Sequence, residues 1–284
     1  MTGSFQLRIV AMVVGAMSLI VVGDVAGRML TAAGFTPFFV AWARFALACA
    51  VLAPFCGLQP GELRALIRPA LILRACIIAA AISCILTALK TEALATVFGG
   101  FFVGPIVSFV LSAFFLKERV TAVRAILLFI SFCGVLLVVK PGFGMTTGLM
   151  FALMAGALHG CYLVTTRWLA SDYRPRFMLF SQLLIGAIVL APAAIGPVPA
   201  MTLSLAGLIA LSAAGSAVGN LLLVIANRTA EASVIAPLIY SQIIVATVLG
   251  FLVFGEWPDA IALVGLAIIV VAGAGSIWAA GRPR

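Results

Sequence analysis

Charge is scarce in this sequence. Asp, Glu, Lys and Arg make up only 9% of the 284 residues, whereas hydrophobic residues make up 65%. Soluble globular domains carry about 25% charged residues, so the composition excludes a soluble fold. It favours a protein that crosses a membrane several times, because about 20 apolar helical residues span a hydrocarbon layer roughly 30 Å thick.

Several chemical motifs are also missing. No GxxxxGK[ST] sequence is present, which excludes ATP hydrolysis at a P-loop. The six cysteines lie in apolar segments without the spacing of metal ligands, and we expect them to be small packing residues. We expect neither a metal nor a cofactor.

An intramembrane enzyme is the remote alternative. A serine hydrolase would need His159, the only histidine, to activate a serine such as Ser108 or Ser216, but no nucleophile motif surrounds either serine. An aspartyl protease would need two aspartates within the membrane, and only Asp24 lies inside a hydrophobic segment. The sequence therefore favours a protein that is not an enzyme.

Apolar residues gather into ten segments of spanning length, separated by short connections that hold nearly all of the charge. We expect an all-α integral membrane protein with ten transmembrane helices. The segments lie near residues 7–30, 37–56, 69–89, 92–116, 121–139, 147–169, 176–195, 203–227, 231–254 and 259–278. The first segment could be read as a cleavable signal peptide, but its removal would break the pairing of the first helix with the sixth, so we reject that reading.

The second half of the chain repeats the first at a constant shift of 138 residues. Pro37 corresponds to Pro175 and Glu118 to Glu256, and a Val-Leu-Ala-Pro run recurs at the same shift. Internal repetition of this kind in a membrane chain is typical of solute carriers, whose binding site lies between the halves.

The repeat divides the chain into residues 1–140, with helices one to five, and residues 141–284, with helices six to ten. Because each unit has an odd number of helices, the second enters the membrane in the opposite direction. We expect two inverted five-helix repeats (5+5) around a central cavity.

The net charge of +9 would suggest a nucleic-acid partner in a soluble protein, but in a membrane protein the position of the cations matters more. With the N-terminus in the cytoplasm, most cations, Arg74 among them, fall on the cytoplasmic side, and only Arg28, Lys90 and Lys140 fall outside. We therefore expect both termini in the cytoplasm, a lipid bilayer as the surroundings and no nucleic-acid partner.

Short motifs add a resemblance to a known family. They are the stretch 41–45 that ends in Arg-Phe, the pair 88–89, Pro105, and the sequence Leu-Lys-Glu-Arg at 116–119. In order and spacing these resemble the drug/metabolite transporter superfamily, EamA type, over essentially the whole chain, and within it the YddG-like bacterial exporters. The resemblance implies a basket of ten helices in the bacterial inner membrane, with a cavity bounded mainly by helices one, three, four, six, eight and nine.

Polar residues inside the hydrocarbon layer are costly unless they face a cavity or a partner. His159 and Tyr162 share one helical stripe, while Ala152, Gly156 and Gly160 form a face typical of close helix packing. This division predicts that His159 and Tyr162 line the cavity and bind substrate. A packing role for His159 is the alternative.

Three further polar residues are candidates for the substrate site. Asn220 belongs to a stripe with Ser212 and Ser216 in the eighth helix. Ser83 and Thr87 belong to a stripe of small residues in the third helix, which could equally be a helix interface.

The fourth and ninth helices correspond under the repeat. Phe102 matches Tyr240, and Gly104 matches Gln242. One aromatic ring from each half predicts a sandwich around an apolar or cationic group, with Gln242 beside it. The residues expected to weaken these two helices, and so to act as gates or hinges, are Gly99, Gly100, Gly104, Pro105 and Pro237.

Asp24 and Arg44 are candidate charge partners for a substrate. Asp24 could instead be neutralised by Arg28, one helical turn later. Arg44 could pair with a substrate carboxylate, but a structural tie between the second helix and a neighbour is the favoured interpretation.

The leading hypothesis is a secondary transporter that exports amino acids or related small metabolites by alternating access. Its partners would be a small zwitterionic substrate and the lipid bilayer. A monomer is one possible oligomeric state. A proton-coupled exporter of cationic drugs is the alternative, but it needs a carboxylate deep in the bilayer, and Asp24 is close to the outer end. Replacement of His159 or Tyr240 by alanine is expected to reduce transport.

Overall fold

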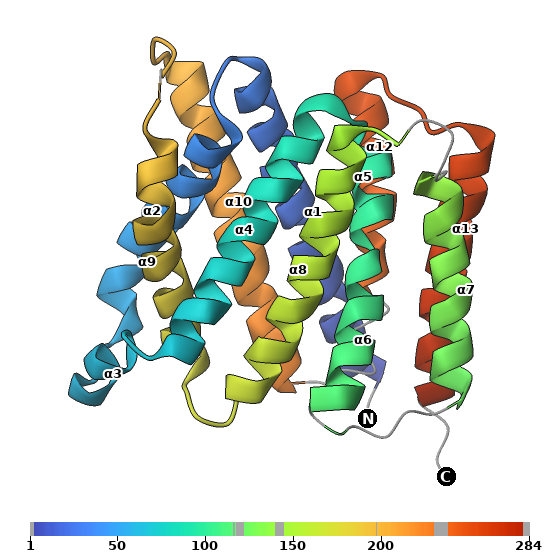
Figure 1. Cartoon of the computed structure of the whole chain (residues 1–284), viewed down its shortest axis with the longest axis horizontal. Helices are drawn as coiled ribbons and strands as arrows, with labels where there is room; N and C mark the ends of the chain where they lie inside the picture. The colour runs from blue at the N-terminus through green and yellow to red at the C-terminus, as the bar shows by residue number, and fades with distance from the viewer. Residues whose placement is uncertain are drawn as a thin grey trace.

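Every regular element among the described residues is a helix (Figure 1). The structure is a computed structural model that describes residues 3–115, 117, 122–139, 145–196, 198–229 and 238–280. Its elements are α1 (Gly3–Ala32), α2 (Pro37–Cys56), α3 (Pro60–Ala65), α4 (Pro69–Thr91), α5 (Leu94–Phe101), α6 (Val103–Phe115), α7 (Ala122–Val139), α8 (Thr147–Leu169), α9 (Pro175–Ala194), α10 (Leu203–Thr229), the 3₁₀ turn η1 (Leu238–Tyr240), α12 (Ser241–Phe254) and α13 (Ala260–Ala280).

Seven helical segments in the described part of the chain are long and apolar enough to cross a membrane. They lie in α1, α2, α4, the consecutive α5 and α6, α8, α9 and α10, and shorter apolar helices lie in α7, α12 and α13. These positions overlap the ten predicted segments, and residues 231–237 of the predicted ninth segment lie outside the described residues. An all-helical membrane fold is therefore confirmed, while the count of ten crossings stays a prediction.

Proline and threonine define the starts of several helices. Thr36 and Thr146 precede α2 and α8, and each hydroxyl accepts a hydrogen bond of 3.1 Å from the backbone N–H three residues later. Proline opens α2, α4 and α9, where its missing N–H would have had no partner within the helix. These local signals explain why the predicted starts of these helices agree with the structure to within one residue.

One helix was not predicted. The sequence pattern predicts a connection over residues 60–65, but they form α3. At its start the Gln59 N–H donates a hydrogen bond of 3.0 Å to Glu62 Oε2. Six residues are too few to show a helical hydrophobic period, so the pattern gave no signal.

The fourth predicted helix is interrupted at Phe102, where α5 gives way to α6. The N–H of Phe102 is shared between the carbonyls of Phe98 and Gly99, at 3.2 and 3.3 Å. Pro105, just beyond, has no N–H for the ladder. The corresponding residue of the second half, Tyr240, also marks a change of helix type, because η1 ends there and α12 begins.

Glycines allow several helices to approach closely. A Cβ atom added to Gly219 of α10 would lie 2.7 Å from the carbonyl oxygen of Ala16 in α1, and one added to Gly104 of α6 would lie 2.7 Å from that of Gly156 in α8. No side chain fits at such distances, so these contacts require glycine. The predicted packing face that contains Gly156 is confirmed.

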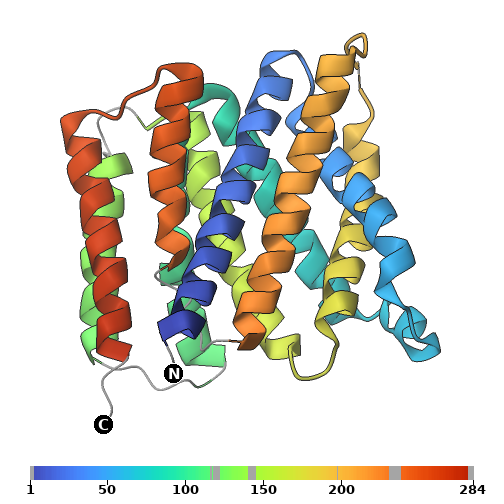
Figure 2. The same cartoon turned by 180° about the vertical axis from the view of Figure 1, so that it is seen from behind.

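Helices that correspond under the repeat run in opposite directions. In Figure 1, α1 and α4 run upward while α8 and α10 run downward, and α2 and α9 are likewise opposed. We call the end where α1 begins and α13 ends the lower end. Figure 2 shows α1 beside α10 in the middle, with the α2–α9 pair at one edge and the α7–α13 pair at the other.

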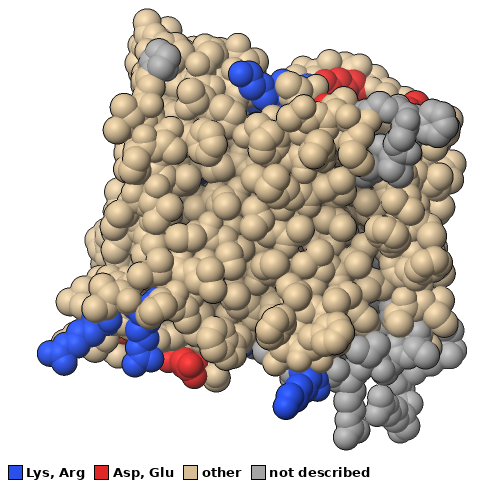
Figure 3. All heavy atoms as spheres, in the orientation of Figure 1, with Lys and Arg blue, Asp and Glu red and all other residues tan. Residues whose placement is uncertain are grey.

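The visible face is apolar between two charged ends (Figure 3). Arg64, Arg68 and Arg174 are exposed at the lower end, and Lys90 is exposed at the upper end. An apolar belt bounded by charge is the surface that a bilayer requires.

Candidate functional site

The first buried polar cluster, here the upper cluster, joins α1, α2 and α10. Arg44 donates from Nη1 to Asp24 Oδ1 at 2.6 Å, from Nε to Ser212 Oγ at 2.7 Å and from Nη2 to the Gly23 carbonyl at 2.7 Å. Arg44 and Asp24 are only 4% and 3% exposed, so they form an ion pair shielded from solvent. Arg44 ties α2 to two neighbours, and the partner of Asp24 is Arg44 rather than Arg28.

The second buried cluster, here the lower cluster, joins α4, α8 and α9. Arg74 donates from Nε to Thr166 Oγ1 at 2.8 Å, from Nη1 to the Met178 carbonyl at 3.0 Å, and from Nη2 to both Tyr162 Oη and Gln182 Oε1 at 3.0 Å. The Tyr162 hydroxyl in turn donates to Gln182 Oε1 at 2.8 Å. All of these acceptors are electrically neutral.

The two clusters use the same positions of the repeat. The 138-residue shift pairs Asp24 with Tyr162, Arg44 with Gln182, and Arg74 with Ser212. Arg44 lies about 10 Å below the upper start of α2, and Gln182 the same distance above the lower start of α9, at ~1.5 Å per residue. The clusters are therefore inverted copies, but the arginine comes from α2 in one and from α4 in the other.

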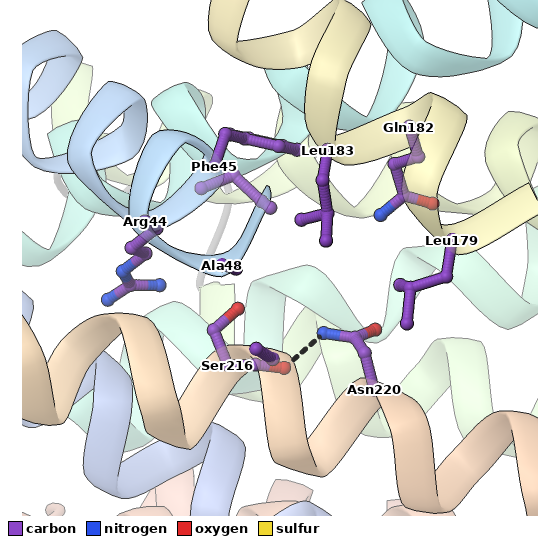
Figure 4. A pocket seen from close by; sticks show the side chains of 10 residues that line it. Arg44, Phe45, Ala48, Leu179, Gln182, Leu183, Ser216 and Asn220 are labelled. Atoms are coloured by element: carbon purple, nitrogen blue, oxygen red, sulfur yellow. Dashed lines mark hydrogen bonds between the residues drawn. The ribbon is translucent and has the colours of Figure 1, made fainter. Parts of the chain in front are cut away.

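A cavity lies between the clusters (Figure 4). In this conformation the cavity itself has a volume of about 20 Å³, and about 310 Å³ when the surrounding space open to solvent is counted. Arg44 of the upper cluster and Gln182 of the lower cluster both line it, as does Asn220, whose Nδ2 donates to the Ser216 carbonyl at 2.7 Å. The remaining lining residues are Phe45, Ala48, Ile82, Leu179, Leu183, Ser216 and Ala217. Both halves of the chain contribute to this cavity.

A second cavity, of about 250 Å³, lies between α2, α4, α8 and α9 and has mainly apolar walls. The predicted residues Ser83 and Thr87 line it. Their hydroxyls donate to the carbonyls of Ala79 and Ser83 in their own helix, at 2.9 and 2.7 Å. Both hydroxyls are therefore satisfied without a ligand.

The predicted aromatic residues form a packed group. Phe102 stacks directly on Tyr240 with ring centroids 4.8 Å apart, and the two residues are 2% and 9% exposed. His159 lies between the rings of Phe101 and Tyr162, at 5.0 and 5.7 Å. Neither cavity described above is lined by Phe102, Tyr240 or His159. In this conformation the rings contact each other instead of flanking an open space.

The other predicted positions surround this group. Gln242 is 5% exposed at the start of α12. Gly99, Gly100 and Gly104 are buried on either side of the helix break. Pro237 lies outside the described residues.

An ion pair joins the two halves at the upper end. Arg28 of α1 donates from Nη1 and Nη2 to Glu256 Oε2 and Oε1 at 2.7 and 2.5 Å. The same guanidinium lies 4.2 Å from the ring centroid of Phe254, the last residue of α12. The upper end of this α1–α12 contact is therefore held by charge as well as by packing.

At the lower end, Arg174 joins the start of α9 to α3. It donates to Glu62 Oε1 and Oε2 at 2.8 and 2.7 Å and to the Gly57 carbonyl at 3.0 Å. The hydrogen bonds from Arg174, together with the one from the Gln59 N–H, hold the pKa of the Glu62 carboxyl below its ordinary value of 4.5.

The sequence missed Arg74 and the Arg28–Glu256 pair as site residues. The charge distribution places Arg74 among the cytoplasmic cations, although the residue lies within the third apolar segment. The rule that made Asp24 a candidate, that charge inside a span needs a partner, applies equally to Arg74 and would have found it.

Long apolar helices, two inverted polar clusters and a cavity between them define a multi-pass membrane transporter. The chain belongs to the EamA-like transporter family, which matches residues 7–140 and again residues 146–278. The predicted membership of the drug/metabolite transporter superfamily is confirmed, and the double match shows the two-repeat architecture of this family.

Comparison with individual proteins agrees with this class. The chain is 26% identical over 170 residues to the S-adenosylmethionine uptake transporter of Rickettsia bellii (strain RML369-C), an alignment that covers 59% of this chain and 58% of the relative. It is 28% identical over 88 residues to an uncharacterized transporter of Archaeoglobus fulgidus, covering 31% and 32%. The chain thus spans less than two thirds of either relative. These names and the family indicate a transporter rather than an enzyme.

A solved crystal structure shares the fold. It matches 97% of each chain with a TM-score of 0.67 at 17% sequence identity. At that identity the likeness concerns the arrangement of helices alone.

Proposed function

We propose that this chain is a secondary transporter that exports amino acids or related small metabolites across the bacterial inner membrane by alternating access. Ten helices in two inverted sets of five would form the carrier, with both termini in the cytoplasm. The exposed arginines at the lower end support this orientation, because cytoplasmic ends of membrane proteins are enriched in cations.

The observation that carries the proposal is the cavity between the two clusters. Its walls come from α2 and α4 of the first half and from α9 and α10 of the second. It is bordered by a neutralised guanidinium at Arg44 and by amides at Gln182 and Asn220. Such mixed polar and apolar walls suit a small molecule that carries both a charged group and an apolar side chain.

The state of Asp24 disfavours the alternative, a proton-coupled exporter of cationic drugs. A carboxylate that exchanges a proton for a cation must be free to change partners, whereas Asp24 is bound to Arg44 at 2.6 Å in a buried site. A zwitterion needs no such group.

The named relative supports the same substrate class. Its name describes uptake of S-adenosylmethionine, a molecule that carries an α-amino acid group. S-adenosylmethionine therefore belongs among the first substrates to test, and its flux should be measured in both directions.

The test is a transport screen in liposomes with labelled amino acids and S-adenosylmethionine, with and without a pH gradient. We expect saturable flux and counterflow of at least one of these compounds in the absence of a gradient. Flux that rises linearly with concentration would indicate a channel instead. Strict dependence on a proton gradient with cationic drugs as substrates would favour the drug exporter.

A further inference from the structure

Arg74 is a buried cation without a buried anion. It is only 3% exposed, and its acceptors are two hydroxyls, an amide oxygen and a backbone carbonyl. An arginine stays protonated in proteins, and a buried charge is costly unless it is paired. Across the described part of the chain, no carboxylate forms an ion pair with Arg74.

The upper cluster shows the same arrangement with its charge balanced. There Asp24 occupies the position that Tyr162 occupies in the lower cluster, and its carboxylate accepts a hydrogen bond from Arg44 at 2.6 Å. In the lower cluster the Tyr162 hydroxyl takes that place, 3.0 Å from Arg74. The lower cluster is the inverted copy of an ion-pair site in which the acidic residue is absent.

Gln182 connects this incomplete site to the cavity. Its side chain lines the cavity, and Figure 4 shows its amide directed from α9 toward the enclosed space. Its Oε1 accepts from both Arg74 and Tyr162, at 3.0 and 2.8 Å. A rotation of this one side chain would release two donors, one on Arg74 and one on Tyr162, to a ligand in the cavity.

We propose that Arg74 binds the carboxylate of the transported substrate. Tyr162 donates a second hydrogen bond to that carboxylate, and Gln182 occupies both donors when the site is empty. The ligand class is a small molecule with a free carboxylate, such as an α-amino acid. This assignment rests on the proposed transport function and adds the group that recognises the negative end of the substrate. Arg44 is not that group, because Asp24 already neutralises it.

The test compares acids with their amides. Counterflow in proteoliposomes is measured for L-serine, L-leucine, L-methionine and L-phenylalanine, each beside its primary amide, in which a neutral amide of similar size replaces the carboxylate. Arg74→Gln removes the charge-assisted hydrogen bonds to the substrate carboxylate. Its KM for the transported acids should therefore be about 10- to 100-fold higher than that of the wild type, while its KM for the amides should change little. Arg64→Gln, which removes an exposed arginine on α3, is the matched control and should transport like the wild type.

A second variant keeps the proposal testable if Arg74→Gln does not fold. Gln182→Glu has nearly the same size and supplies Arg74 with an internal carboxylate, so it should compete with the substrate. We expect a folded protein with higher thermal stability than the wild type and a KM for the acids raised at least about tenfold.

The outcomes separate the two proposals. If the wild type transports the acids but both variants match it, or if acids and amides lose affinity equally, the role of Arg74 is overturned while transport of amino acids stands. If the wild type shows no saturable flux of any probe, the proposed function fails and the carboxylate site fails with it.

Discussion

Arg28 and Glu256 come from opposite halves of the chain and share two hydrogen bonds of 2.5 and 2.7 Å at the upper end. Their side chains are 14% and 29% exposed, so the pair is partly shielded from water. It lies where α1 ends and α12 ends, above the level of both polar clusters. An alternating-access carrier would have to separate these two residues whenever its upper end opened.

Glu256→Gln should loosen this contact. Partly exposed ion pairs contribute about 1 kcal/mol or less, so we expect up to a roughly fivefold shift toward states with an open upper end. Hydrogen exchange of the segment 252–259 should become faster, while exchange in α7 should not change. Identical exchange in variant and wild type would show that the pair does not hold this end closed.

Asp24→Asn should destabilise the protein strongly, because it leaves the buried guanidinium of Arg44 without a counter-charge. Breaking one partner of a buried pair costs about 3–5 kcal/mol. The melting temperature of the detergent-purified protein measures the effect. The double variant Asp24→Asn with Arg44→Gln should recover much of the loss, since glutamine occupies the corresponding position 182 in the second half. A single variant as stable as the wild type would contradict the burial argument.

Gly219→Ala should disturb the α1–α10 contact, because the added Cβ would lie 2.7 Å from the Ala16 carbonyl oxygen. Forced separation of packed helices costs about 1–3 kcal/mol. Gly207, in the same helix, has no atom within 4 Å of an added Cβ, so Gly207→Ala is the matched control. It should leave stability unchanged or raise it slightly through helix propensity. Equal melting temperatures for the two variants would mean that the helices do not meet at Gly219 as closely as described.

Tyr240→Ala should reduce transport, whereas Tyr240→Phe should retain most of it. The stack with Phe102 depends on the ring and contributes about 0.5–1.5 kcal/mol, and phenylalanine preserves it. Membrane expression of both variants should match the wild type and serves as the control. A phenylalanine variant as impaired as the alanine variant would assign the function to the hydroxyl instead of the ring.

Glu62→Gln should alter the dependence of stability on pH. The folded-state pKa of Glu62 lies below 4.5, so the contribution of its pair with Arg174 is present above that pH. It is lost as pH falls through the lowered pKa. The wild type should therefore lose more thermal stability between neutral and strongly acidic pH than the variant. Asp172→Asn removes another acidic side chain at the lower end. The pH dependence of its stability should match that of the wild type.

The sequence predicted the helical membrane fold and the helix starts well, because both depend on local signals. Apolar runs of spanning length mark the helices, and Pro37 and Thr146 stand at helix starts where their chemistry is required. The break at Phe102 also falls among the glycines and the proline that predicted a weak fourth helix.

The site was harder to predict because pairing between distant helices has no local signature. Asp24 has a cation one turn away in sequence, yet its partner Arg44 lies on another helix. Tyr162 was expected to face open space, but it bonds to Arg74, 88 residues away. Helical periodicity predicts on which face of its helix a residue lies. It does not predict which residue of another helix contacts that face.

In the proposed alternating-access cycle, the two clusters would also affect the relative energies of the states that are open to each side. If the halves were chemically identical, a protein that rocks about its midplane would be equally stable when open to either side. Here one half supplies an aspartate where the other supplies a tyrosine, and the arginines stand at positions that do not correspond. The unloaded molecule should therefore rest facing one side of the membrane by preference, even when no gradient acts on it.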